Sequence, residues 1–345
     1  MNHIVIIRPN YLLKGSHTTG FMKQDRQHLI RSLRGRRSKG EDEYAKPFFK
    51  WAGGKSQLLY EFDSRFPHSL ETDALVSYIE PFVGGGAVFF YIAQLYPIKE
   101  SVICDINPEL ILTWRVVKQD VTALIRLLSD LQEMYDTRDE ALQLDLFYQI
   151  RDDLNRQKPS FDYETYGSHT IKRASQLLFL NKTCFNGLFR LNSRGEFNVP
   201  FGKYKNPNIV QEKNLIRASH LLTHTTIIQG DFTTCLEYVT SSSFVYIDPP
   251  YRPLNKTSSF TAYSQEGFSE QDQIRLMNFF RAVDKAGAKV MLSNSDPRNE
   301  NPEDHFFDDL YQDYVIERVL AKRFINSKGD KRGAINELII RNYQE

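Results

Sequence analysis

From about residue 46 onward, short apolar runs alternate with longer segments of helical periodicity. The runs with the length and boundaries of buried strands are 78–81, 101–104, 226–229, 244–247, 289–293 and 337–341. The segments with the apolar spacing of helices are 87–96, 111–117 and 270–286. This order of strand, loop, helix and strand predicts an open α/β sheet covered by helices.

The pattern changes between residues 118 and 224. This region contains helical runs at 121–135 and 174–182 and an irregular stretch rich in glycine and asparagine at 185–202. We therefore expect one α/β domain, formed by residues 46–117 plus 225–345, with a mostly helical domain inserted at 118–224. Residues 1–45 lack sustained periodicity and carry five basic residues between Arg31 and Lys39. We expect a flexible basic extension there, which could contact phosphate.

The charge of the chain is balanced overall but not locally. There are 44 Lys and Arg residues against 43 Asp and Glu, a formal net charge of +1, and 41% of residues are hydrophobic. This composition excludes a disordered chain and a uniformly basic nucleic-acid-binding protein. Residues 129–153 carry eight acidic and two basic residues, whereas 171–224 carry nine basic and two acidic. Aromatic and asparagine residues lie among the basic ones, which favours nucleic-acid contact over a merely solvated face.

Cysteine usage and hydropathy indicate an intracellular protein. Cys104, Cys184 and Cys235 form no CxxC pair, so we expect reduced, buried thiols and neither a disulfide framework nor a metal site. Apolar runs fall short of the roughly 18 residues of a membrane span, and the amino terminus lacks signal-peptide architecture. We therefore expect a cytoplasmic protein without a membrane partner.

The tetrapeptide Asp248-Pro249-Pro250-Tyr251 directly follows the apolar run 244–247. An Asp at the carboxyl end of a buried strand lies where open α/β sheets bind ligands. Prolines lack the backbone N–H donor, so carbonyl acceptors in the turn stay available. The Asp248 carboxylate and the Pro249 carbonyl could thus hold an amino group and raise its electron density, while the Tyr251 ring stacks on a base. A rigid strand-end turn is the structural alternative.

A glycine-rich loop at 84–86 joins the first expected strand to a helix, where a ligand could approach the backbone closely. Asp105 lies 19 residues past Gly86 and ends the second expected strand, where an acid can bind ribose hydroxyls. Trp51 and Lys55 would suit a carboxylate-bearing cofactor. The GGK at 53–55 lacks P-loop spacing, so ATP is not indicated. A plain turn and a capped helix start are the structural alternatives.

In combination these stretches resemble Dam-type (Dam/DpnII-like) DNA adenine-N6 methyltransferases. The matching stretches are FFKWAGGK at 48–55, EPFVGGGAVF at 80–89, DINPEL at 105–110, LNKTCFNGLFRLNSRGEFNVPFGKYK at 180–205, DPPYRPL at 248–254 and FTAY at 260–263. The resemblance covers about residues 47–342 and implies a Rossmann-like S-adenosylmethionine-dependent methyltransferase sheet with an inserted, mostly helical DNA-recognition domain. It also implies a monomeric enzyme that methylates adenine N6 within GATC in double-stranded DNA by base flipping, using S-adenosylmethionine and no metal.

The resemblance implies three groups of site residues. The catalytic group is Asp248, Pro249 and Tyr251. The cofactor-binding group is Trp51, Lys55, Phe82, Gly84, Gly86, Asp105, Asp231, Phe232 and Asp248. The DNA-binding group is Lys50, Phe185, Asn186, Leu188, Arg190, Arg194, Pro200 and Lys203. Phe185 stands where enterobacterial relatives have Tyr, so a stacking contact is expected there without a hydroxyl contact.

Three other functions fit part of the pattern. A cytosine-N4 or RNA amino-methyltransferase could use the same tetrapeptide. A catalytically silent DNA-binding relative would not need the intact DPPY and glycine loop. A nicotinamide oxidoreductase is disfavoured because VGGGAV departs from GxGxxG and DPPY has no role in hydride transfer.

Overall fold

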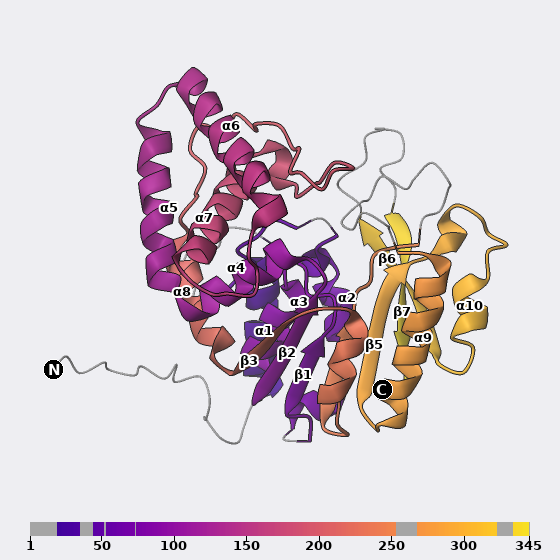
Figure 1. Cartoon of the computed structure of the whole chain (residues 1–345). Helices are drawn as coiled ribbons and strands as arrows, with labels where there is room; N and C mark the ends of the chain where they lie inside the picture. Colours follow the sequence, from indigo (N-terminus) through magenta and orange to yellow (C-terminus); the bar gives the residue numbers. More distant parts are fainter. Residues whose placement is uncertain are drawn as a thin grey trace.

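The computed structural model describes residues 19–34, 44–51, 53–72, 74–252, 268–322 and 334–344. Within these residues, seven strands form one sheet in the order β3-β2-β1-β4-β5-β7-β6 (Figure 1). The strands are β1 (Ser77–Glu80), β2 (Glu100–Asp105), β3 (Thr225–Gln229), β4 (Ser243–Ile247), β5 (Lys289–Ser295), β6 (Val315–Lys322) and β7 (Ala334–Arg341). Strands β1 to β5 are parallel, whereas β7 is antiparallel to both of its neighbours.

Helices cover both faces of the sheet. Successive side chains of a strand point to opposite sides, and in these strands the side chains on both sides are apolar. Tyr78 and Tyr246 belong to the hydrophobic cluster on one face, and their neighbours Ile79 and Val245 belong to the cluster on the other. The helices of the first face are α2 (Leu59–Asp63), α3 (Ala87–Leu95) and α4 (Pro108–Gln119). The helices of the second face are α9 (Glu270–Lys285) and α10 (Phe306–Leu310). The sheet is therefore buried on both sides, as expected for a parallel α/β protein.

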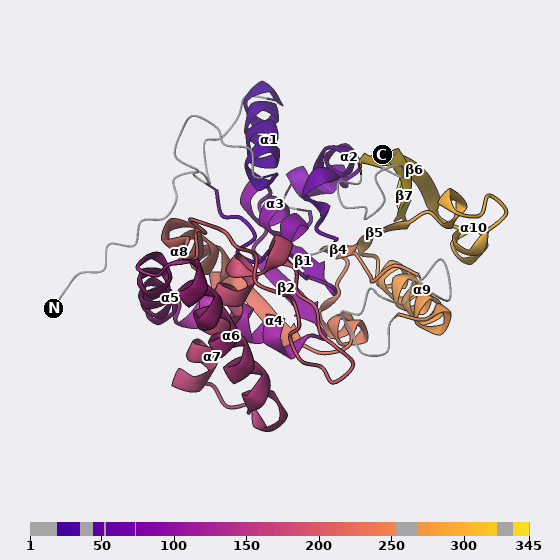
Figure 2. The ribbon, with the colours of Figure 1, turned by 90° about the horizontal axis from the view of Figure 1, so that it is seen from above.

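The region between α4 and β3 is mostly helical, as expected. Its helices are α5 (Val121–Asp136), α6 (Glu140–Gln157), α7 (Ser168–Thr183) and α8 (Glu212–Leu221). Seen from above, α5 to α7 lie on the opposite side of the molecule from β6, β7 and α10 (Figure 2). Helix α7 packs against α4, α5 and α6, so this region shares a hydrophobic cluster with one face of the sheet. Its status as a separate domain stays a prediction.

Residues 19–34 correct one expectation. They lie in the region expected to be a flexible extension, but α1 (Thr19–Leu33) packs against α3 and buries Leu29, Ile30 and Leu33. Arg26 of α1 also pairs with two acidic residues of the main body. The apolar positions of this short helix are few, and the basic run beside them dominates the local pattern. Residues 1–18 and 35–43 lie outside the described residues.

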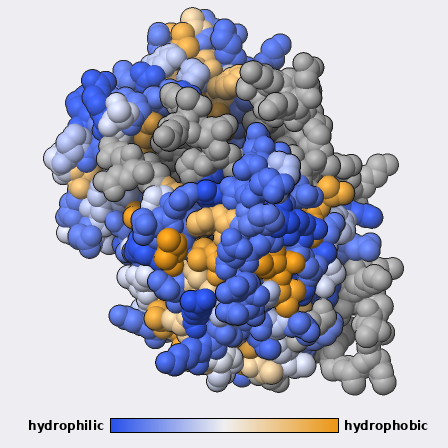
Figure 3. Space-filling view, turned by 90° about the vertical axis from the view of Figure 1, so that its right-hand side faces the viewer, coloured by the Kyte–Doolittle hydropathy of each residue, from blue (hydrophilic) through white to orange (hydrophobic). Residues whose placement is uncertain are grey.

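The expected strands are confirmed, and β6 is an additional one. At the edge of the sheet its apolar sequence is interrupted by Glu317 and Arg318, and Val319 is buried but Leu320 is 69% exposed. The face that carries this edge shows small apolar patches among hydrophilic residues (Figure 3). The three cysteines are buried free thiols. No helix of the described residues is long and apolar enough to cross a membrane.

A buried ion pair joins α7 to α4. The Arg173 guanidinium donates to both carboxylate oxygens of Glu109, one of them at 2.8 Å, and Tyr163 donates its hydroxyl to the same carboxylate at 2.6 Å. Arg173 and Glu109 are almost completely buried. This contact fixes the helices of residues 118–224 to the side of the sheet that carries β2.

We expect Arg173→Ala to lower the free energy of unfolding by about 3–5 kcal/mol, because it leaves the Glu109 charge buried without its partner. Urea unfolding followed by circular dichroism measures this. Arg151→Ala is the matched control, because Arg151 pairs with the more exposed Asp152 and should lose only about 0–1 kcal/mol. Equal, small losses in both variants would contradict this account.

Candidate active site

Acidic side chains gather at the carboxyl edge of the sheet. Glu80 and Asp105 are the last residues of β1 and β2, Asp248 directly follows β4, and Asp231 lies two residues after the end of β3. Because these strands are parallel and adjacent, their carboxyl ends meet at one edge, where open α/β sheets bind ligands. The structure thus brings together acidic residues that lie far apart in the sequence.

Lys55 lies at the centre of this edge. It opens the short 3-10 helix Lys55–Gln57, and its Nζ lies 2.6 Å from Asp248 Oδ1 and 2.7 Å from the Tyr251 hydroxyl oxygen. Burial opposes the ammonium charge, but the Asp248 carboxylate and other nearby acidic groups outweigh it, so the pKa of Lys55 is raised. Lys55 therefore stays cationic and holds the catalytic carboxylate expected from the sequence.

Asp248 has a second partner on the neighbouring strand. The Ser293 hydroxyl of β5 donates to Asp248 Oδ1 at 3.3 Å, and the Tyr246 hydroxyl lies 2.8 Å from Ser293 Oγ. Burial raises the pKa of Asp248, while Lys55 and Ser293 oppose the rise. Within the described residues, both partners contact Oδ1, which leaves Oδ2 available to accept a hydrogen bond from a ligand.

The glycine loop after β1 is shaped by two tryptophans. Gly84 has a φ of +47°, and a Cβ there would lie 2.9 Å from Cδ1 of Trp51. The Trp114 indole donates to the Gly84 carbonyl at 3.2 Å, and the Trp51 ring stacks on Phe189 at 5.1 Å. A side chain larger than glycine cannot fit at Gly84 without moving Trp51.

The Asp105 carboxylate binds the backbone of the same loop. Its Oδ2 accepts from the Gly84 N–H at 3.1 Å, and its Oδ1 accepts from the Asn107 N–H at 3.0 Å. Burial raises the pKa of Asp105, although these backbone hydrogen bonds oppose the rise. The next side chain, Ile106, is 62% exposed although it is apolar. An apolar residue exposed beside an acidic one suits a ligand that carries both a flat ring and hydroxyl groups.

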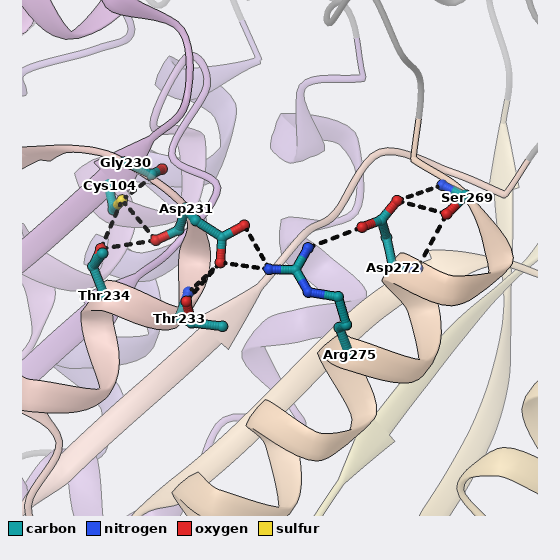
Figure 4. Close-up of polar contacts among 8 residues, drawn as sticks. All are labelled: Cys104, Gly230, Asp231, Thr233, Thr234, Ser269, Asp272 and Arg275. Carbon is teal, nitrogen blue, oxygen red and sulfur yellow. Dashed lines mark hydrogen bonds and ion pairs between the residues drawn. The ribbon is translucent and has the colours of Figure 1, made fainter.

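Asp231 follows β3, the strand at one end of the sheet, and its carboxylate points toward Arg275 of α9 (Figure 4). The Asp231 carboxylate accepts from the Thr233 N–H and hydroxyl and pairs with Arg275 of α9 at 3.0 Å. Burial opposes the charge, but the bonds from Thr233 and Arg275 outweigh it, so the pKa of Asp231 is lowered. Phe232 is buried and stacks on Phe82 at 5.3 Å. Both residues thus reach the edge where the sequence placed them.

Most residues expected to contact DNA are exposed on or beside the segment that follows α7. The exposed ones are Lys50, Phe185, Asn186, Arg190, Arg194, Pro200 and Lys203. Leu188 is partly buried against the hydrophobic core. Asn186 has a φ of 57°, and Phe185 is 53% exposed although it is aromatic. An exposed aromatic ring at a tight turn is available for stacking.

Asn181 connects this segment to the backbone of Lys50. Its side chain accepts from the Lys50 N–H at 2.8 Å and donates to the Lys50 and Gly187 carbonyls at 2.9 and 3.0 Å. Bridges between Cys184 and Phe201 and between Leu191 and Phe197 give the segment the form of a hairpin. Lys50 and the hairpin are therefore held side by side.

The hairpin itself is stiffened by polar contacts. Arg190 Nε donates to Asn198 Oδ1 at 2.8 Å, and Arg194 pairs with Glu196 at 2.8 Å. Asn155 of α6 exchanges two hydrogen bonds with the Phe197 backbone, at 2.8 and 3.0 Å. Because Arg190 uses only part of its guanidinium in these contacts, further N–H groups remain for a partner.

Comparison with known proteins places this arrangement in a family. The model of the D12 class of N6 adenine-specific DNA methyltransferases matches residues 51–325. The chain belongs to this class. It is therefore an adenine-specific DNA methyltransferase of the Dam family, and DNA is its substrate.

Relatives of the D12 class align over most of this chain. The type II methyltransferase M.MjaIII of Methanocaldococcus jannaschii is 51% identical over 299 residues, which are 86% of this chain and 99% of the relative. The type II methyltransferase M1.LlaDCHI of Lactococcus lactis is 37% identical over 86% of this chain and 95% of the relative. The DNA adenine methylase of Escherichia coli is 31% identical over 85% of this chain and 93% of the relative.

Several residues at this edge of the D12 methyltransferase were not expected from the sequence. They are Tyr246, Ser293 and Glu337 around Asp248, Arg275 on Asp231, and the exposed Ile106. Ser293 and Glu337 lie in runs recognised only as strands, and their polar side chains at strand ends were the available signal. The contacts of Arg275 come from a helix and have no local sequence signature.

We expect Arg275→Ala to raise the pKa of Asp231 toward its ordinary value. Because the pKa is lowered in the folded protein, the ion pair stabilises the fold at neutral pH and loses this contribution as the pH falls through the Asp231 pKa. The variant should lose about 0.5–1 kcal/mol at neutral pH and nothing in acid, since the pair is partly exposed.

Carbon-13 titration of the Asp231 carboxyl measures its pKa, and urea unfolding at neutral and at acidic pH measures the change in stability. Arg281→Ala is the matched control, because Arg281 lies on the same helix and pairs with Asp313 instead. An Asp231 pKa that is the same in Arg275→Ala and wild type would contradict the assignment.

Proposed function

We propose that this methyltransferase transfers a methyl group from S-adenosylmethionine to adenine N6 within GATC, acting as a monomer on a base flipped out of the duplex. The observation that carries the proposal is the partly buried Asp248 carboxylate, held through Oδ1 by Lys55 and Ser293 beside Tyr251. This is an acceptor prepared for an amino group at the ligand-binding edge of the sheet.

The chain's own residues fit S-adenosylmethionine. Gly85 of the glycine loop is partly exposed at this edge, and Asp105 and the exposed Ile106 suit ribose hydroxyls and a flat ring. Phe82, Phe232 and Asp231 would complete the adenosine side, and Trp51 would lie toward the methionine side. When bound, the cofactor supplies an electrophilic methyl group on a sulfonium.

Asp248, Pro249 and Tyr251 would then act on the adenine. Asp248 Oδ2 and the Pro249 carbonyl accept the two N–H bonds of N6, which orients its lone pair and increases its electron density. The N6 lone pair would form the new N–C bond as the bond from the methyl group to the sulfonium sulfur breaks and a neutral thioether leaves, and N6 would then lose a proton to water. The Tyr251 ring stacks on the base. Asp248 acts as an electrostatic partner, with the Lys55 ammonium beside its carboxylate at 2.6 Å.

The hairpin after α7 would read the DNA. Flipping an adenine out of the stack costs a few kcal/mol, and Phe185 could fill the space that the base leaves. Arg190 can read a guanine, while Lys50, Arg194 and Lys203 contact phosphates. Support for GATC comes from the likeness of residues 180–205 to the Dam-type block. Asn186, Leu188 and Pro200 would shape the turn that presents these contacts.

We expect Asp248→Ala to lower methyl transfer by roughly 100-fold or more without unfolding the protein, because the acceptor for N6 is lost. Incorporation of tritiated methyl groups into GATC-containing duplex measures the rate, and circular dichroism checks the fold. Asp130→Ala, at an exposed position of α5, is the control. Incorporation by Asp248→Ala at the wild-type rate would overturn its catalytic role.

We expect Arg190→Ala to weaken discrimination at one guanine by roughly 1–3 kcal/mol, because a bidentate contact to that base is lost. The ratio of kcat/KM for GATC and for duplexes with one substituted base measures the effect. Arg194→Ala should instead weaken all duplexes alike, as expected for a phosphate contact. An unchanged ratio in Arg190→Ala would refute the assignment.

A further inference from the structure

Glu337 is a buried carboxyl group at the carboxyl edge of the sheet. The reaction proposed for Asp248, Pro249 and Tyr251 does not use it. It lies on β7, opposite Ser295 of β5 and Val319 of β6. Because Ser295 ends the parallel strand β5, its partner Glu337 lies at the same edge as Asp248. Glu337 is 5% exposed, so it makes its contacts inside the protein.

Glu337 is connected to Asp248 through two intermediate groups. The Tyr251 hydroxyl donates to Glu337 Oε2 at 2.6 Å and accepts from Lys55 Nζ at 2.7 Å, and Lys55 Nζ lies 2.6 Å from Asp248 Oδ1. A phenol has a single proton to donate. Since Glu337 takes this proton, the Tyr251 oxygen can only accept from Lys55, and the direction of every hydrogen bond in the chain is fixed.

Fixing these directions matters for Asp248. Without an acceptor at Glu337, the Tyr251 proton would be free to turn toward other nearby acceptors, of which the Asp248 carboxylate is the strongest. Tyr251 would also lose the contact that anchors the outer end of its ring. Both changes would act on the groups that hold the base, because hydrogen bonds to buried charges are strong and directional.

We propose that Glu337 is a positioning residue for methyl transfer: by accepting the Tyr251 proton, it fixes the Tyr251 ring, directs Lys55 onto Asp248 Oδ1 and reserves Oδ2 for the adenine amino group. The inference rests on the function proposed above for Asp248 and Tyr251. It assigns a role in the reaction to β7, the antiparallel strand, which carries no motif of the family resemblance.

Three variants separate the parts of the proposal. Glu337→Leu removes the acceptor at similar size, Glu337→Gln keeps an acceptor oxygen without the charge, and Tyr251→Phe removes the hydroxyl alone. The measurements are the single-turnover methylation rate at saturating cofactor and DNA, the cofactor dissociation constant by calorimetry, and the melting temperature. Fluorescence of 2-aminopurine at the target position reports whether the base still leaves the stack.

We expect Glu337→Leu and Tyr251→Phe each to lower the single-turnover rate roughly tenfold to a hundredfold. The double variant should be no slower than the slower single variant, because both changes break one chain of bonds. Glu337→Gln should recover part of the rate. The cofactor dissociation constant, the melting temperature and the 2-aminopurine signal should change far less than the rate. Glu133→Gln, at an exposed site of α5, is the matched control.

Three results would overturn the role of Glu337. One is a wild-type rate in Glu337→Leu, or in Glu337→Gln and Tyr251→Phe if the leucine variant does not fold. Another is a double variant whose loss of rate is the product of the two single losses. A loss of rate matched by equal losses of cofactor affinity and stability would also overturn it, because a merely structural role requires that pattern. If Asp248→Ala retains full activity, the proposed function itself fails; if it is inactive while the Glu337 variants match wild type, only the role of Glu337 fails.

Discussion

The ion pair between the buried Lys55 and the partly buried Asp248 is the contact on which the carboxyl edge of the sheet depends. Burying either charge alone would cost several kcal/mol, so the two residues need each other. Through Lys55 and Asp248 the pair also connects Tyr251, Ser293 and the remote Glu337. Parts of the chain that fold into the 3-10 helix before β1 and into β4, β5 and β7 are thereby held as one network. The fold can keep a charged carboxylate at this edge because the network compensates it.

The hairpin after α7, which we propose contacts DNA, is attached to the same edge. Asn181 of α7 holds the Lys50 backbone next to the hairpin, and Trp51, one residue further on, lies against the glycine loop and Phe189. Lys50, Trp51 and Lys55, which lie within six residues of chain, therefore contact the hairpin, the glycine loop and the Asp248 carboxylate. The near-zero net charge is consistent with this local arrangement, because the acidic residues of 129–153 lie on α5 and α6 and offset the basic ones at 171–224.

The sequence predicted those parts of the structure that local patterns determine. Apolar runs identified β2 and β4, and Asp105 and Asp248 were found because each directly follows such a run. Edge strand β6 was missed because Glu317 and Arg318 break its apolar run. Helix α1 was missed because its few apolar positions precede a basic run. Glu337 and Arg275 act through partners far away in the sequence, Tyr251 and Asp231, and no local pattern reports such pairs.

The most direct test of the account is single-molecule sequencing of DNA from cells that express the protein, because it identifies both the modified base and its sequence context. The account predicts N6-methyladenine at GATC sites with the wild-type protein and none with Asp248→Ala. N4-methylcytosine, or N6-methyladenine in a different sequence context, would contradict it.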